Sequence, residues 1–156
     1  MSEPFEAPID GRQSEAALAI ARGVRRLLRA HGFATVTELP LTSGRRADVV
    51  GVNGDGALVI VEIKSSVADF RADHKWGDYF AHCDRLYFAV GAEMPLAIMP
   101  EEAGLIVADS YGGEILREPP ARAIPPGARR AVLLRLALAA ADRLHRLADP
   151  GAAPET

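Results

Sequence analysis

Two carboxylates and a lysine lie at spacings that could support metal-dependent chemistry. Asp48 belongs to an apolar segment, residues 47–52, and Glu62 and Lys64 end a second apolar segment, residues 57–64. The sequence Asn-Gly-Asp-Gly between the two segments is a strong β-hairpin signal. Asp48 comes about seven residues before the middle of that turn and Glu62 about eight residues after it, so antiparallel pairing predicts that their carboxylates lie close together.

A carboxylate pair of this kind suits a hard divalent cation. Mg²⁺ is usually held by one or two carboxylates, and water and substrate phosphate complete its coordination. Such an ion polarises a phosphate and lowers the pKa of a bound water. The ammonium group of Lys64 could orient that water or stabilise the charge that grows on the phosphate. Asp48, Glu62 and Lys64 are therefore candidate catalytic residues for phosphodiester hydrolysis; the alternative is an ordinary ion pair on a strand.

Periodicity predicts the elements that must hold these residues in place. Residues 57–64 are apolar on both faces in their first half, which indicates a central strand covered on both sides. The predicted elements in chain order are a helix over 11–31, strands over 33–41, 47–52 and 57–64, a helix over 73–83, strands over 84–90, 104–109 and 113–118, and a helix over 128–148. This order predicts an α/β fold with an αβββαβ core, in which helices flank a mixed central sheet, plus a C-terminal extension.

Length and composition are those of one globular domain. The chain has 156 residues, of which 49% are hydrophobic, and this excludes a disordered chain. We predict a flexible tail over 1–12, a single domain over 13–148 and a disordered tail over 149–156. A single cysteine, Cys83, excludes an internal disulfide and a cysteine-rich zinc site. No apolar run reaches the roughly 18 residues of a membrane span, and the acidic start lacks an apolar signal region, so we expect a cytoplasmic protein.

The charge distribution limits how nucleic acid could be bound. The net charge is -3, whereas proteins that coat DNA by bulk electrostatics are strongly basic, so contact must come from a local patch. Arg45 and Arg46, in the turn before Asp48, could clamp phosphates, although a solvated turn explains them equally well. The arginines of the first helix are interpreted as a solvated face, with DNA contact as the alternative: Arg22, Arg25, Arg26 and Arg29.

Four segments together form a specific sequence pattern, although each alone is a weak signal: GRRAD, EIKSS, DHKW and CDRLYFAV. Over about residues 15–118 the chain resembles the MmcB family of bacterial DNA repair proteins. Within this stretch, Asp48 and the tripeptide 62–64 closely resemble the PD-(D/E)xK nuclease motif. The resemblance implies a restriction-endonuclease-like fold and an association with DNA repair.

The resemblance to the nuclease motif also implies roles for single residues. Asp48 and Glu62 would be metal ligands, the carbonyl of Ile63 would be a further ligand, and Lys64 would be the catalytic lysine, with Mg²⁺ or Mn²⁺ as the cofactor. The first residue of the motif, often proline, is Ala47 here. That departure removes no ligand.

Residues around the motif are weaker candidates. In related nucleases an acid from the first helix or strand often completes the metal site, and Glu38 is the first candidate here and Glu15 its rival, unless both are merely solvated. Lys75, near the start of the second predicted helix, is a candidate phosphate contact. Asp73 is predicted to cap that helix and Trp76 to pack in the core.

These features together predict a DNA repair protein with a metal-dependent nuclease fold that hydrolyses DNA phosphodiester bonds. One rival is a DNA-binding repair accessory with the same fold that does not cut. Another is a structural module in which the three residues form an ion pair. DNA is the expected partner, a homodimer and other repair proteins are open alternatives, and no membrane contact is expected.

Overall fold

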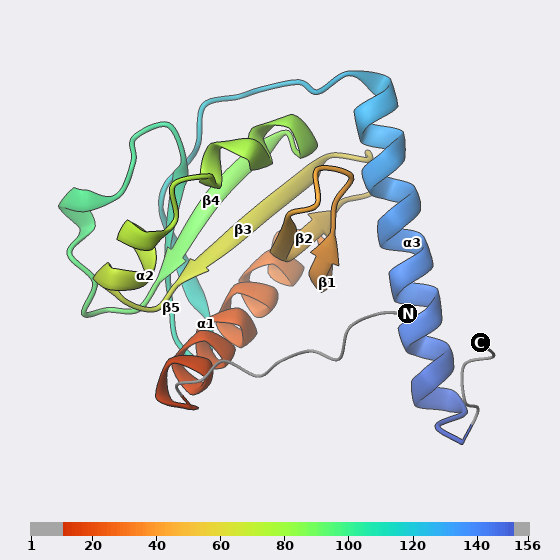
Figure 1. The fold of residues 1–156 in the computed structure, drawn as a ribbon, viewed down its shortest axis with the longest axis horizontal. Coiled ribbons are helices and arrows are strands. Elements are labelled where there is room, and N and C mark those ends of the chain that lie inside the picture. Colours follow the sequence, from red (N-terminus) through yellow and green to blue (C-terminus); the bar gives the residue numbers. More distant parts are fainter. Residues whose placement is uncertain (1–10, 152–156) are drawn as a thin grey trace.

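The computed structural model describes residues 11–151, in which helices flank a mixed β-sheet (Figure 1). The tails predicted at 1–12 and 149–156 fall largely outside these residues. In chain order the elements are α1 (Gly11–Ala30), β1 (Ala34–Pro40), β2 (Arg46–Val52), β3 (Leu58–Lys64), α2 (Val67–Ala72), the 3-10 helix η1 (Trp76–His82), β4 (Arg85–Val90), the 3-10 helix η2 (Leu96–Ile98), β5 (Gly104–Ala108), β6 (Gly113–Arg117) and α3 (Pro126–Ala148).

The six strands form one mixed sheet in the order β1-β2-β3-β4-β5-β6. The β1–β2, β2–β3 and β5–β6 pairs are antiparallel, and β3–β4 and β4–β5 are parallel. The predicted hairpin joins β2 to β3, and β4 follows β3 after a helical crossover. The predicted mixed sheet and αβββαβ order are therefore confirmed.

Apolar side chains cover both faces of the sheet, as a central β3 requires. On one face Ile20, Val24 and Leu28 of α1, which are one helical turn apart, pack in a cluster that includes Val59 and Val61 of β3. Because these side chains are buried, α1 is held against this face of the sheet, across β3. Each such burial contributes about 1.5–3 kcal/mol to folding.

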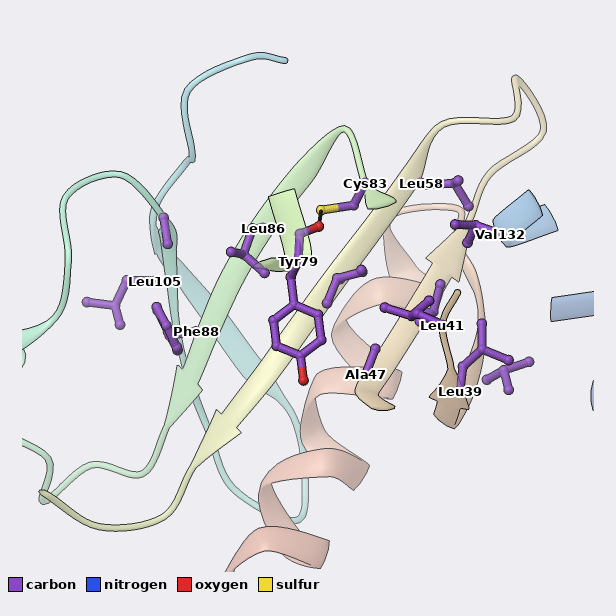
Figure 2. Packing of buried hydrophobic residues seen from close by; sticks show 14 of the residues in the cluster. Leu39, Leu41, Ala47, Leu58, Tyr79, Cys83, Leu86, Phe88, Leu105 and Val132 are labelled. Carbon is purple, nitrogen blue, oxygen red and sulfur yellow. Dashed lines mark hydrogen bonds between the residues drawn. The ribbon is translucent and has the colours of Figure 1, made fainter. Parts of the chain in front are cut away.

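The opposite face carries the larger cluster, to which η1 contributes Tyr79 and α3 contributes Val132 (Figure 2). Phe88 of β4 is fully buried there and makes edge-to-face contacts with Phe70 and Trp76. The prediction that Trp76 packs in the core is confirmed. Cys83, 1% exposed, is likewise a buried small side chain.

The helix predicted over 73–83 is confirmed only in part, because residues 76–82 form a 3-10 helix and not an α-helix. The α-helix lies earlier, at α2, and a 3-10 helix, η1, follows it. Ser66 is the N-cap of α2, because its Oγ accepts the Asp69 N–H at 3.0 Å. Asp73 ends α2 with φ −91° and ψ 101°, so it is not the N-terminal cap that the sequence predicted.

The last helix, α3, begins at Pro126, two residues before the predicted start, because proline suits the first helical turn. It packs against β1 and η1. Four of its leucines are more than half exposed: Leu134, Leu138, Leu144 and Leu147. Among the described helices, none has the length and apolar character that a membrane span requires.

Candidate active site

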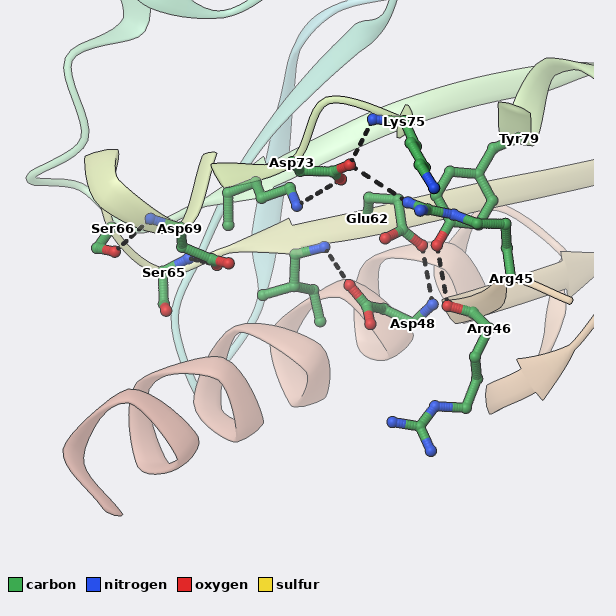
Figure 3. Close-up of polar contacts among 12 residues, drawn as sticks. Arg45, Arg46, Asp48, Glu62, Ser65, Ser66, Asp69, Asp73, Lys75 and Tyr79 are labelled. Carbon is green, nitrogen blue, oxygen red and sulfur yellow. Dashed lines mark hydrogen bonds and ion pairs between the residues drawn. The ribbon is translucent and has the colours of Figure 1, made fainter. Parts of the chain in front are cut away.

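The predicted pair of carboxylates, Asp48 and Glu62, is present. Their side chains accept backbone hydrogen bonds at the point where the β2–β3 ladder ends. The last pair of the ladder is Val49 with Val61. Beyond it, the Asp48 N–H donates to Oε1 of Glu62 at 2.9 Å. The Ile63 N–H donates to Oδ2 of Asp48 at 2.8 Å (Figure 3). Each carboxylate therefore stands in for a backbone carbonyl of the neighbouring strand, and the backbone fixes both carboxylates.

Burial makes this pair costly to ionise. Glu62 is 4% exposed. Burial, followed by the charge of Asp48, raises the pKa of the Glu62 carboxyl well above its ordinary value. Burial also raises the pKa of the Asp48 carboxyl, and backbone donation from Ile63 opposes that shift only in part. A divalent cation between the two would favour both charged forms, so this donor set fits Mg²⁺ or Mn²⁺.

The motif lysine is paired with a carboxylate from another segment. Lys64 is 6% exposed, and its Nζ lies 2.8 Å from Oδ2 of Asp73. Nη2 of Arg45 lies 3.2 Å from the other oxygen of Asp73, which also accepts the Lys75 N–H at 3.0 Å. Burial works against ionisation of Asp73, but the hydrogen bonds from Lys64 and Lys75 outweigh it and lower the pKa of the Asp73 carboxyl.

Asp73 is the site residue that sequence reasoning missed. Its carboxylate joins Lys64 of β3 to Arg45 of the β1–β2 turn, and the sequence indicated only a helix cap. The signal available was an acid in the basic segment DHKW, close after the motif strand. The partner could not be inferred, because it depends on how the end of α2 folds back over β3.

The basic turn before Asp48 is held by Tyr79 of η1. The guanidinium carbon of Arg45 lies 5.1 Å from the centre of the Tyr79 ring, within range of a cation–π contact. The Tyr79 hydroxyl donates to the carbonyl of Arg46 at 3.0 Å. The 3-10 helix thus contacts two of the predicted phosphate-binding residues, Arg45 through its guanidinium and Arg46 through its carbonyl. The side chain of Lys75, the third, is exposed.

The predicted third acid does not join the pair in a ligand cluster. Glu38 falls between the β1–β2 register pairs Thr37–Val49 and Leu39–Ala47, and it is exposed, with φ 50°. The Arg143 guanidinium binds the carbonyl of Glu38 at 3.1 Å. Within residues 11–151, no group of three or more histidine, cysteine, aspartate or glutamate side chains is placed to hold a metal. The roles of Glu38 and of its rival Glu15 stay predictions.

The site opens onto a groove between α1 and the sheet, with a volume of about 1430 Å³. Asp48, Glu62 and Lys64 line it together with both arginines of the basic turn. Glu38 also lines this groove, whereas Glu15 does not. The sequence prediction brought the three motif residues together correctly, and the structure adds the groove in front of them.

Comparisons with known proteins place the chain in a family. A family described as DNA repair protein MmcB-like matches residues 5–151. The structure of SPO1766, a protein of unknown function from Silicibacter pomeroyi, is similar with 42% identity and a TM-score of 0.87, over 90% of this chain and 97% of that chain. A repair endonuclease from Pyrococcus abyssi is a remote match, with 22% identity and a TM-score of 0.34 over 57% of this chain and 40% of that one. No curated protein matches the chain.

Proposed function

Since this chain belongs to the MmcB-like family of DNA repair proteins, we propose that it is a metal-dependent deoxyribonuclease of the PD-(D/E)xK type. The supporting observation is the buried pair of Asp48 and Glu62 at the open end of the β2–β3 ladder. Burial raises the pKa of both carboxyls, so the pair is unfavourable as two bare charges. A bound cation removes that cost.

In this proposal Asp48, Glu62 and the carbonyl of Ile63 hold Mg²⁺ or Mn²⁺. The ion would polarise the scissile phosphate and make a bound water acidic. The water oxygen forms a bond to phosphorus and one P–O ester bond breaks, which leaves a phosphomonoester on one fragment and a hydroxyl on the other.

The cationic residues act on the phosphate. Asp73 keeps the ammonium group of Lys64 in place at the edge of the groove. Lys64 and Arg45 are both paired with the Asp73 carboxylate. A phosphate that enters the groove can replace Asp73 as the anionic partner of the two cations. Lys64 then stabilises the charge that develops on the phosphate, and Arg45 and Arg46 hold its neighbours.

The test is cleavage of labelled single-stranded, duplex, flap, fork and four-way-junction DNA with Mg²⁺ or Mn²⁺. Wild type is compared with Asp48→Asn, Lys64→Ala and a control, Asp55→Asn, whose exposed side chain lies in the hairpin turn. We expect metal-dependent cutting that both site variants lose and the control keeps. DNA that is bound but never cut by the wild type would overturn the proposal.

One observation favours a second candidate, a non-cleaving DNA-binding repair accessory. Asp48 and Glu62 accept backbone hydrogen bonds that complete the sheet, so their presence also has a structural reason. An accessory of this kind would bind DNA equally well with Asp48→Asn and would cut none of the DNA forms. Binding and cleavage measured on the same DNA forms separate the two candidates. The nuclease binds and cuts DNA, whereas the accessory only binds it.

A further inference from the structure

The groove that leads to the carboxylate pair has a wall of arginines on α1. Arg22, Arg25, Arg26 and Arg29 all line it and are all exposed. The opposite side of α1 carries the buried residues Ile20, Val24 and Leu28. Helical spacing places the four arginines on the side of α1 away from the sheet, yet all four are among the residues that line the groove.

The groove is locally basic in an acidic protein. Its lining contains seven cations, the four arginines of α1 with Arg45, Arg46 and Lys64, and five acids, Glu38, Asp48, Glu62, Asp69 and Asp73. The lining thus carries a formal charge of +2, whereas the whole chain carries -3. In the described part of the chain, none of the four α1 arginines forms an ion pair with an acid. Their charge is therefore available to an anion in the groove.

Two of these arginines are oriented by neutral partners. Nε of Arg25 donates to the Thr35 hydroxyl at 2.9 Å, and Nη1 of Arg26 donates to the carbonyl of Tyr111 at 3.2 Å. A guanidinium has five N–H donors, so each arginine keeps further donors for a ligand. Arginine also matches phosphate geometry better than lysine does.

The size of the groove fits a polymer better than a small molecule. Its volume of about 1430 Å³ exceeds the roughly 300–1,000 Å³ of ordinary small-molecule pockets. Arg22 and Arg29 are two turns apart, which is about 10 Å along the helix axis. Successive phosphates of one strand rise about 3.4 Å along the axis of a duplex, so a duplex whose axis runs parallel to α1 would place roughly three of them along the wall.

We infer that the α1 arginines hold the sugar–phosphate backbone of a DNA strand and lead it to Asp48 and Glu62, with Arg45 and Arg46 on the far side of the groove. This inference rests on the proposed function, because it takes DNA as the substrate of the same site. The contacts are to phosphates, so binding at this wall is independent of sequence and sensitive to salt.

The test is DNA affinity as a function of salt, without divalent metal, for the full chain. Arg22→Gln/Arg29→Gln is compared with wild type and with a matched control on α3, Arg130→Gln/Arg146→Gln, two exposed arginines outside the groove. If each lost arginine gives up one phosphate contact, the slope of log affinity against log salt falls in magnitude by about 1.8 on duplex and about 1.4 on single-stranded DNA. The ratio of variant to wild-type affinity then changes about tenfold between 50 and 200 mM salt. The control keeps the wild-type slope.

An unchanged slope in the α1 variant, or an equal change in the control, would overturn the inference, as would a wild type without DNA affinity. Cleavage is scored separately with metal present. If the wild type cuts DNA and the α1 variant keeps the wild-type slope, then the nuclease proposal holds and the inference about the α1 arginines fails. A reduced slope in a protein that never cuts supports the wall and refutes the nuclease. Thermal melting of each variant confirms that the compared chains are folded.

Discussion

The acidic and the cationic halves of the site are built in different ways. Asp48 and Glu62 are held by backbone N–H groups of adjacent strands, so their geometry is a property of the sheet. Lys64 and Arg45 come from different segments and depend on one side chain, Asp73, for their common position. The backbone of the sheet therefore fixes the two carboxylates, whereas in the proposed mechanism the two cations are reassigned from Asp73 to a phosphate.

The largest expected effect is on the acidic half. Asp48→Asn should abolish metal-dependent cleavage, because the amide can still accept the Ile63 N–H but is a poor ligand for Mg²⁺. The same change should leave the melting temperature unchanged or raise it, because it removes a buried charge. Turnover and thermal melting measure the two effects. A variant that melts far below wild type, while Asp55→Asn does not, would contradict the view that the backbone fixes this half.

Asp73→Asn should have the next largest effect, because both cations lose their shared carboxylate. We expect a loss of about 1.5–3 kcal/mol in the free energy of unfolding, typical of hydrogen bonds to charged groups. Cleavage should fall about 10- to 100-fold, as when partners that orient active-site groups are removed. Chemical denaturation and turnover at several pH values test this. Asp78→Asn, an exposed acid of η1, is the matched control and should change neither.

Stability should depend on pH in opposite directions for the two halves. The pKa values of Asp48 and Glu62 are raised in the folded state from ordinary values of 3.8 and 4.5, so the folded protein holds more protons. Without metal, stability should therefore fall as pH rises from about 4 through the raised pKa values. The pKa of Asp73 is lowered from 3.8, so its stabilisation is lost only as pH falls below that value.

The measurement is melting temperature against pH, with and without Mg²⁺. The metal should flatten the decline above pH 4, because it binds the deprotonated pair. Asp48→Asn/Glu62→Gln should flatten it without metal. If this double variant keeps the slope, then the decline comes from other groups in the chain.

The smallest expected effect concerns the link from η1 to the basic turn. Tyr79→Phe removes the hydrogen bond to the Arg46 carbonyl but keeps the ring under Arg45, so we expect a loss of about 0.5–1.5 kcal/mol in unfolding free energy. Cleavage should fall only a few-fold. Tyr111→Phe, at a tyrosine that is 82% exposed, is the control. A cleavage loss as large as that of Asp73→Asn would show that the turn, and not the shared carboxylate, positions the cations.

Local signals explain which parts of this fold could be predicted. The Asn-Gly-Asp-Gly turn and the alternation around it fix the β2–β3 pairing, and therefore place Asp48 beside Glu62. The helix α2 has six residues and buries none of them, so it has no periodicity to detect. The partner of Asp73 is set only by tertiary packing. So is the groove below α1, whose arginines look solvated on an isolated helix.

The use of Asp48 and Glu62 as hydrogen-bond acceptors for the sheet has an evolutionary consequence. Asparagine and glutamine can accept the same backbone bonds without the cost of burying adjacent charges. Selection for folding alone would therefore let both positions drift to amides, while selection for metal chemistry would oppose that drift. Lineages in which both positions stay acidic are those expected to have kept the chemistry, and paired amides would mark lineages that kept only the fold.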